Sequence, residues 1–295
     1  MPELYDKIGV GYDGTRCADP FIANKLVDLL DINPQSRIID IACGTGNYTV
    51  ALNNAGYSMT GVDISLEMLK KAQQKNHQIN WLNSDVSKIP LDDAFFDGAI
   101  CTLACHHFAN RIAVFSEVFR LINKGKFVIL TCDHEQIRNY WLYRYFPEVL
   151  EFMTSYMPSV HELIDELCSI DFRLSSIVPY YISADLQDNF LGARIEQPDL
   201  YLNESFRNGM SIFSDKADPY LVEKGCVRLR QDINTGKIHH RILLHAYSHH
   251  DRIFFSCIPG IILRDISDQC LHILNLLAIN RNVIVILLEI IDLHL

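Results

Sequence analysis

The chain has 295 residues, of which 49% are hydrophobic and 21% are charged, so it can bury a large core. We expect one domain of about 240 residues and an additional segment, because single cores rarely grow much larger. The formal net charge of -10, without any lysine or arginine run, argues against nucleic acid as the main partner and favours a small-molecule substrate. The nine cysteines lie mostly in apolar runs and predict reduced thiols in a cytoplasmic protein.

The N-terminal region is predicted to combine a flexible segment with a helix. Residues 1–6 show no basic region followed by an apolar one, so we predict no secretory signal. Residues 5–16 are rich in glycine and aromatic side chains and are flexible enough to fold over a site. Asp19 and Pro20 predict a helix start, because Asp caps helices and Pro is tolerated at the first helical position.

The next stretch, residues 38–49, predicts a strand, a tight turn and a helix. Residues 38–41 are almost wholly apolar, as in a strand buried on both faces of a parallel sheet. Gly44 and Gly46 allow a sharp turn and a close approach of a ligand to bare backbone. The free N–H groups of the following helix suit a carboxylate or a phosphate, so this geometry leaves both a dinucleotide and S-adenosylmethionine open.

Neighbouring residues favour the methionine cofactor. Thr49 stands where a dinucleotide fingerprint carries Gly or Ala, which weakens an NAD site. Asp40 lies inside the first strand, and Asp63 ends a second apolar run, 17 residues beyond Gly46. A carboxylate at a second strand tip is well placed to accept both hydroxyls of an adenosine ribose. Residues 83–86 form a third such tip.

Further strands and helices alternate along the chain, which predicts an α/β doubly wound sheet with helices on both faces. Ligands of such sheets bind at the carboxyl ends of the strands, where these motifs fall. The predicted strands are 57–62, 78–82, 97–102, 126–131 and 172–182, and the predicted helices are 65–75, 111–121 and 161–168.

From about Tyr5 to about Leu130 the ordered motifs resemble the class I S-adenosylmethionine-dependent methyltransferases, in particular the type 11 group that includes the ubiquinone and sterol methyltransferases. The resemblance implies a Rossmann-like, mostly parallel seven-stranded sheet. It also implies that residues 42–46 line the methionine moiety, that Asp63 holds the ribose, and that Asp85 with Val86 brackets the adenine. The cofactor-binding residues expected in this way are Tyr12, Arg16, Asp40, Ala42, Cys43, Gly44, Gly46, Asp63, Ile64, Asp85, Val86, Cys101 and Thr102.

Several of these residues have a plainer alternative. Each aspartate could instead be a helix N-cap or a solvated loop residue. In the family that the chain resembles, an N-terminal segment closes over the cofactor, which implies this role for Tyr12 and Arg16. The segment could also be a surface loop whose tyrosines pack on the sheet.

Two adjacent histidines, His106 and His107, follow the fourth strand and are expected to overlook the transferable methyl group. A contact with the acceptor, or removal of its proton, is the catalytic prediction. Helix capping or core packing is the alternative. Cys101 and Cys105 beside adjacent histidines lack the usual metal-ligand spacing, so we predict no metal site.

The pattern becomes less regular after residue 133. Residues 138–156 carry many aromatic side chains at spacings that a helix could use, and most are expected in the core. Residues 187–213 predict a helical insertion before the last strand, and substrate choice is expected to lie in these elements.

The C-terminal tail, 242–295, departs from the pattern of the family. From residue 241 onward 25 of 55 residues are Ile, Leu or Val, but charges interrupt every apolar run before 18 residues, so we predict no membrane-spanning helix. One interpretation is an added element that covers a sheet edge or forms a homodimer contact. The preferred one is translation in a shifted reading frame, because the segment lacks clean periodicity and turn signals.

These observations predict a methyltransferase domain over 1–241, with its cofactor-binding core at about 36–132. The predicted function is transfer of a methyl group from S-adenosyl-L-methionine to a small molecule. The alternatives are a non-catalytic sensor or assembly protein that binds this cofactor, and an oxidoreductase that uses NAD.

Overall fold

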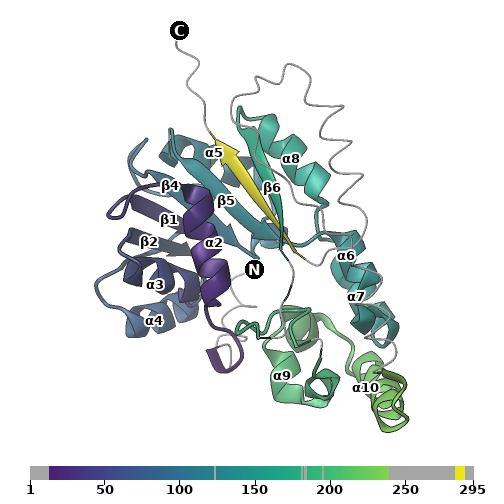
Figure 1. Cartoon of the computed structure of the whole chain (residues 1–295). Helices are drawn as coiled ribbons and strands as arrows, with labels where there is room; N and C mark the ends of the chain where they lie inside the picture. Colours follow the sequence, from purple (N-terminus) through teal and green to yellow (C-terminus); the bar gives the residue numbers. More distant parts are fainter. Residues whose placement is uncertain are drawn as a thin grey trace.

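A computed structural model of the chain describes residues 13–122, 124–180, 182, 185–194, 196–238 and 283–289. All strands in this part of the chain belong to one sheet, in the order β3-β2-β1-β4-β5-β7-β6 (Figure 1). The strands are β1 Arg37–Ile41, β2 Ser58–Asp63, β3 Asn80–Asn83, β4 Gly98–Thr102, β5 Lys126–Thr131, β6 Arg173–Tyr180 and β7 Val283–Glu289.

Strands β1 to β5 are parallel, which confirms the prediction of an α/β fold with a Rossmann-like sheet. The strand order reverses between β1 and β4, where a doubly wound sheet opens a crevice at the carboxyl ends of its strands. The α-helices of the described residues are α2 Pro20–Leu30, α3 Asn47–Asn54, α4 Leu66–Lys75, α5 Arg111–Ile122, α6 His134–Asn139, α7 Pro147–Thr154, α8 Val160–Cys168, α9 Glu204–Asn208 and α10 Pro219–Asn234.

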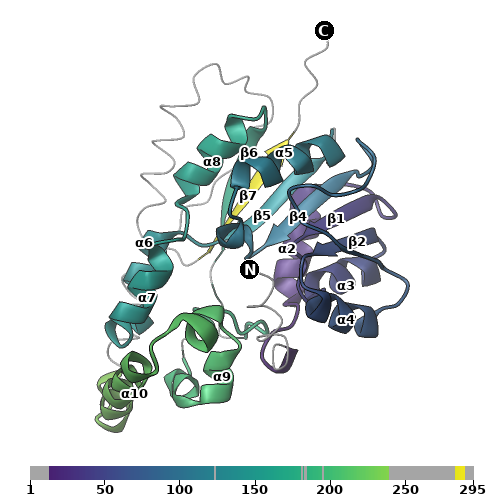
Figure 2. The ribbon, with the colours of Figure 1, turned by 180° about the vertical axis from the view of Figure 1, so that it is seen from behind.

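Helices cover both faces of the sheet. Alternate residues of β1 face opposite sides, so that Ile38 packs with α2 and α3, whereas Ile39 and Ile41 pack with α5 and α8. Figure 1 shows α2 in front of the sheet, and Figure 2 shows α5 and α8 from behind. Because both faces of the sheet are covered, side chains that point in either direction along a strand are buried, and the strands therefore read as continuous apolar runs.

The predicted helix starts follow from their capping residues. Asp19 caps α2 by accepting hydrogen bonds from the backbone N–H groups of Phe21 and Ile22, and Pro20 is its first residue. Ser65 caps α4 in the same way by accepting from the N–H of Met68. Two boundaries differ by two residues: β3 begins at Asn80 instead of residue 78, and β6 ends at Tyr180 instead of residue 182.

The aromatic-rich stretch does not form the single helix that its spacing allowed. It divides into α6, the 3-10 turn Trp141–Arg144 and α7, which starts at Pro147. A proline lacks the N–H that continues a helix, so it favours a new start. Most of the aromatic rings are buried as expected, although Phe152 is 50% exposed.

These elements pack with the late part of the chain in a third apolar cluster, which we call the distal cluster. It is separate from the two clusters on the sheet faces and joins residues 137–157 with residues 201–238. The late elements are the short helices Pro198–Leu202, α9 and Ile212–Lys216, followed by α10. The 16-residue helix α10 was not predicted from the sequence. Figure 1 shows α7, α9 and α10 grouped beyond one end of the sheet.

Part of the tail belongs to the sheet. This differs from the preferred interpretation, translation in a shifted reading frame, in which the segment would never have been selected to pack. Residues 283–289 form β7, antiparallel to both β5 and β6. Their sequence is a β-branched and leucine-rich run, which is typical of a strand inside a sheet and need not alternate. A strand paired on both sides is also not available as a free edge for a homodimer. The rest of the tail lies outside the described residues.

Within the described ranges, no helix has the length and apolar character needed to cross a membrane.

Candidate functional site

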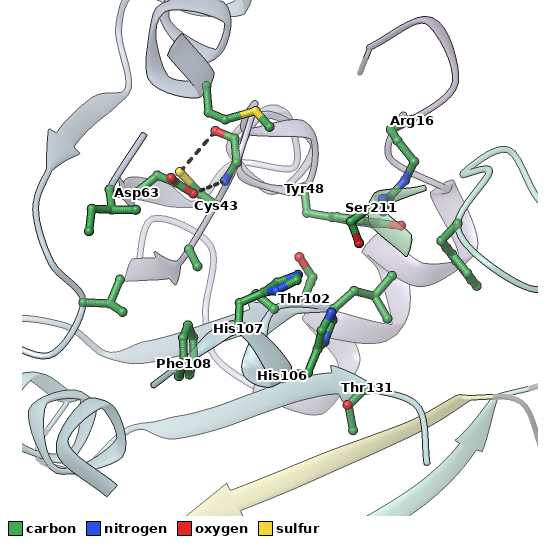
Figure 3. A pocket seen from close by; sticks show the side chains of 18 of the residues that line it. Arg16, Cys43, Tyr48, Asp63, Thr102, His106, His107, Phe108, Thr131 and Ser211 are labelled. Atoms are coloured by element: carbon green, nitrogen blue, oxygen red, sulfur yellow. Dashed lines mark hydrogen bonds between the residues drawn. The ribbon is translucent and has the colours of Figure 1, made fainter. Parts of the chain in front are cut away.

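A cavity of about 550 Å³ lies at the carboxyl ends of β1, β2, β4 and β5. Its wall includes Ala42 after β1, Asp63 at the end of β2, Thr102 at the end of β4 and Thr131 at the end of β5. Figure 3 shows these strand ends with the two histidines between them. The cavity therefore occupies the crevice expected at the reversal of strand order.

The two glycines of the turn after β1 have different functions. Gly44 has a φ of 57° and lines the cavity, and a Cβ added there would meet no atom within 4 Å. Gly44 therefore leaves room for a ligand against the backbone. Gly46 has a φ of 73°, and its added Cβ would lie 2.3 Å from the ring of Trp81. Gly46 thus allows helix α3 to pack and does not line the cavity.

Asp63 joins the glycine turn to the start of α4. It is 8% exposed, and its Oδ2 accepts a hydrogen bond from the Gly44 N–H at 2.8 Å (Figure 3). Its Oδ1 accepts from the Ser65 N–H, also at 2.8 Å. A carboxylate oxygen has two acceptor positions, so neither of these two hydrogen bonds by itself prevents a contact with a ligand hydroxyl. The local capping alternative and a ligand contact are therefore compatible at this residue.

Asp85 is more exposed and has a local partner. Its Oδ1 accepts hydrogen bonds from the backbone N–H and the hydroxyl of Ser87 at 2.8 and 2.7 Å. These bonds lower the pKa of Asp85, since they favour its ionised form. The carboxylate shapes a turn that lines the cavity together with Val86 and Ile64.

Three of the expected cofactor residues, Asp40, Gly46 and Cys101, lie behind the cavity wall instead of lining it. Asp40 is 1% exposed and faces α3, where its Oδ2 accepts from the Thr49 hydroxyl at 2.6 Å. Burial raises the pKa of Asp40 to about 7, although this hydrogen bond opposes the shift. Cys101 is fully buried in the core on the other face of the sheet. The alternation of side chains along a strand explains Cys101, which is next to the cavity-lining Thr102. Asp40 lies before the end of β1 and is covered by α3.

The described end of the N-terminal segment is fixed by a carboxylate far away in the sequence. Arg16 donates from Nε and Nη2 to the two oxygens of Asp188, which is 1% exposed. The Tyr48 hydroxyl donates to the same carboxylate at 3.1 Å. All three residues line the cavity, and Figure 3 shows Arg16 and Tyr48 on the same side of it. Tyr12, the other residue expected here, lies outside the described residues.

A lysine side chain stabilises the glycine turn through hydrogen bonds. Lys75, near the end of α4, donates to the carbonyl oxygen of Thr45 at 2.9 Å, to Asn47 Oδ1 at 2.6 Å and to Asp13 Oδ1 at 2.7 Å. Burial lowers the pKa of Lys75, and the bond to Asp13 opposes this shift. The functions of Lys75 and Asp13 were not predicted from the sequence, because neither residue belongs to a local motif.

His106 and His107 lie on a single 3-10 turn directly after β4. Their rings are half-buried, with centroids 3.9 Å apart, and both line the cavity (Figure 3). The turn is held by the Leu103 N–H, which donates to the carbonyl of Leu130 at 2.8 Å. The structure therefore places the two histidines next to each other at the cavity wall. In the described part of the chain, no group of three His, Cys, Asp or Glu side chains is arranged to hold a metal ion.

The wall opposite the glycine turn is apolar and was not predicted residue by residue. It comes from the distal cluster, and methionines are prominent in it. Its members include Met153, Met157, Leu191, Met210 and Ile212. These residues come from three separate stretches of the chain, so no sequence motif marks them.

Comparison with known proteins identifies the family. A family model described as a methyltransferase domain matches residues 39–130. A solved structure from Anabaena variabilis, described as a methyltransferase of an antibiotic biosynthesis pathway, superposes with a TM-score of 0.73 and 31% identity, covering 92% of this chain and 98% of that one. The chain belongs to the class I S-adenosylmethionine-dependent methyltransferases.

Two curated relatives match part of the methyltransferase. The Bacillus subtilis methyltransferase homologue YqeM is 37% identical over 111 residues, which are 35% of this chain and 44% of that protein. A demethylmenaquinone methyltransferase of Corynebacterium kroppenstedtii is 28% identical over 130 residues, covering 42% and 56%. The chain thus spans about half the length of the curated relatives it matches.

The residues of this methyltransferase fit the cofactor of its family. The open space at Gly44 would allow a ligand to lie against the protein backbone, and the Asp63 carboxylate is hydrogen-bonded to that same residue. Thr49 is explained by its hydrogen bond to Asp40, a partner that the Gly or Ala of a dinucleotide fingerprint would not provide. The S-adenosylmethionine site is therefore expected along Gly44, Asp63 and Asp85.

Proposed function

We propose that this protein transfers a methyl group from S-adenosylmethionine to a small molecule bound between the histidines and the distal cluster. The observation that carries this proposal is the cavity itself. One continuous space of about 550 Å³ is lined both by the cofactor motif at Gly44 and Asp63 and by the apolar wall at Met153. This volume falls in the range of small-molecule sites, about 300–1,000 Å³. The demethylmenaquinone in the name of one relative is also a small molecule.

Residues of the glycine turn and of the strand tips would hold the cofactor. Ala42, Cys43 and Gly44 would lie along its methionine part, Asp63 would accept the ribose hydroxyls, and Asp85 with Val86 would flank the adenine. Arg16, held by Asp188 and Tyr48, would keep the N-terminal segment beside this site. We further propose that Tyr12 contributes to the same closure, as the family resemblance implies.

The cofactor supplies an electrophilic methyl group on a sulfonium. In the transfer, the bond between methyl carbon and sulfur breaks, its electron pair stays on sulfur, and a lone pair of the acceptor forms the new bond to carbon. The protein needs no covalent nucleophile, because holding the two reactants in line contributes up to about 7–11 kcal/mol in favourable cases. The apolar wall excludes water from the reacting groups.

We propose that His106 or His107 contacts the acceptor and takes the proton that it loses. Both rings face the cavity from the end of β4, and imidazole exchanges protons near neutral pH (Figure 3). Single and double changes to Gln at these positions should lower turnover and alter its pH profile while leaving cofactor affinity within about twofold. Unchanged turnover and an unchanged pH profile would assign both histidines a structural role.

We also propose a catalytic domain in which residues 131–157 and 188–212 form the acceptor side of the site, with α10 packed in the cluster behind it. The short helices within 198–212 are consistent with the predicted helical insertion at 187–213, and the pairing of β7 supports a domain that extends beyond its predicted end at residue 241. A cytoplasmic location is supported by the seven described cysteines, all of which are free thiols. The acidic net charge of -10 supports a small molecule over nucleic acid as partner.

Isothermal titration with S-adenosylmethionine and S-adenosylhomocysteine tests the first step of this proposal. Folded protein should bind both, and lack of binding to either would refute it. A screen of acceptors with radiolabelled methyl donor then tests transfer. Cofactor binding without transfer to any member of a broad set would favour a sensor or assembly function.

A further inference from the structure

We propose that the methyl acceptor is an uncharged molecule with an apolar body, which binds against a wall of three methionines, Met153, Met157 and Met210. We call these three residues the methionine wall. The proposal rests on the proposed function and specifies the class of substrate that the cavity accepts.

The methionine wall is part of a packed layer. Met153 lies on α7, Met157 follows that helix, and Met210 lies between α9 and the turn Ile212–Lys216. All three line the cavity and are less than a tenth exposed, and they belong to the distal cluster. A ligand that binds against this surface removes apolar area from water, which is favourable.

Charge on the cavity wall is unfavourable for an anionic acceptor. Among the described lining residues, Arg16 is the one side chain with a permanent positive charge, and its Nε and Nη2 already donate to the carboxylate of Asp188. The other charged lining residues, Asp63, Asp85 and Asp188, are carboxylates. A carboxylate or phosphate moved from water to the methionine wall would lose its hydration without gaining a cation, which is costly.

The acceptor side also carries polar side chains. His106, His107, Thr131 and Ser211 line the cavity together with the methionine wall, and Figure 3 labels all four. An acceptor with one polar nucleophilic group and an apolar body would satisfy both regions at once. Thioether side chains are unbranched and adaptable, so the wall should accept several apolar shapes.

The test uses the complex with S-adenosylhomocysteine and three matched pairs of probes: 2-naphthol with 6-hydroxy-2-naphthoate, decanol with decanoate, and farnesol with farnesyl phosphate. In at least one pair, the neutral member should bind at least about tenfold more tightly by titration calorimetry, a difference of about 1.4 kcal/mol. Equal or tighter binding of the anion in every pair, or no binding of any neutral probe, would overturn the proposal. Failure of S-adenosylhomocysteine to bind at all would instead refute the proposed function.

A pair of variants on one helix locates the effect. Met153→Arg places a cation in the wall and should shift the preference toward the anion of each pair by at least about tenfold. Phe152→Arg, at the neighbouring 50% exposed position, introduces the same charge outside the cavity and should leave the preference within about twofold. Equal shifts in both variants would show that long-range charge, and not the methionine wall, sets the preference. If Met153→Arg does not fold, Met210→Arg is the second variant, with the same expected reversal.

Discussion

The two sides of the cavity are built in different ways. The cofactor side consists of short turns at successive strand ends, where Gly44 and Asp63 are joined by a direct hydrogen bond. The acceptor side is a layer assembled from residues 131–157 and 188–212, which meet only in the folded chain. The first side is defined by local backbone geometry and the second by packing. Different acceptors can therefore be served by changing the second side while the cofactor side stays the same.

Both sides of the cavity rest on the same sheet, so a substitution that destabilises the sheet should impair both sides together. Ile286 of β7 pairs with Ile129 of β5 and Ile177 of β6. Proline at this position would remove a ladder donor from a strand with two neighbours, and Ile286→Pro should lower the free energy of unfolding by about 3 kcal/mol or more. Thermal unfolding should show a decrease in Tm of about 6–12 °C relative to the conservative variant Ile286→Val. Equal Tm values for the two variants would argue against β7 as part of the sheet.

The cofactor side alone should respond to Asp63. Asp63→Ala removes the acceptor of the Gly44 and Ser65 N–H groups as well as the expected ribose contact. Affinity for S-adenosylhomocysteine, measured by titration calorimetry, should decrease by on the order of 2–4 kcal/mol. Asp85→Ala is the control, because that carboxylate is exposed, and it should decrease affinity by about 1 kcal/mol or less. Equal losses would contradict the ranking of these two residues.

The acceptor side alone should respond to Gly225. This residue of α10 lies against Phe146, and an added Cβ would approach that ring to 2.3 Å and the carbonyl oxygen of Tyr145 to 2.8 Å. Gly225→Ala should lower the free energy of unfolding by about 1–3 kcal/mol through overpacking, and it should reduce turnover. Affinity for S-adenosylhomocysteine should stay within about twofold.

Val227→Ala provides the matched control on the same helix, because Val227 is 51% exposed. It should leave chemical denaturation curves nearly unchanged. A loss of S-adenosylhomocysteine affinity in Gly225→Ala of about tenfold or more would show that the two sides are not separable.

The smallest effect concerns Asp40, which lies behind the cofactor side. Its pKa is raised by burial from 3.8 to about 7, so the native state binds its proton more tightly than the unfolded state. The contribution of Asp40 to stability is therefore fully present below about pH 4 and is lost as the pH rises to about 7. Asp40→Asn keeps an acceptor for Thr49 without the charge and should be more stable than the wild type by on the order of 1–2 kcal/mol at pH 8. Melting curves at pH 5 and pH 8 measure this, and an advantage of the same size at both pH values would contradict it.

The acceptor side could not be predicted from the sequence, because it depends on contacts between residues that are far apart in the chain. Met153 and Met210 are separated by a strand and several turns, and Asp188 meets Arg16 from 172 positions away. Contacts of this kind carry no period and no local signature, since they depend on how the layers are stacked. The same reason applies to the tail. A continuous apolar run is compatible with an interior strand or with no structure, and only its pairing with β5 and β6 distinguishes them.

The sequence by itself determined the parallel sheet, the turn at Gly44 and the position of Asp63 at a strand tip, because local geometry is written in residue type and spacing. Only the tertiary structure decided which of the neighbouring residues reach the ligand. Cys101 is one residue away from the cavity-lining Thr102, and Asp40 is two residues before the cavity-lining Ala42, yet both point into the layers on either side of the sheet. A change of one position along a strand reverses the direction of a side chain, so a motif identifies a region of the site and the packed sheet selects its residues.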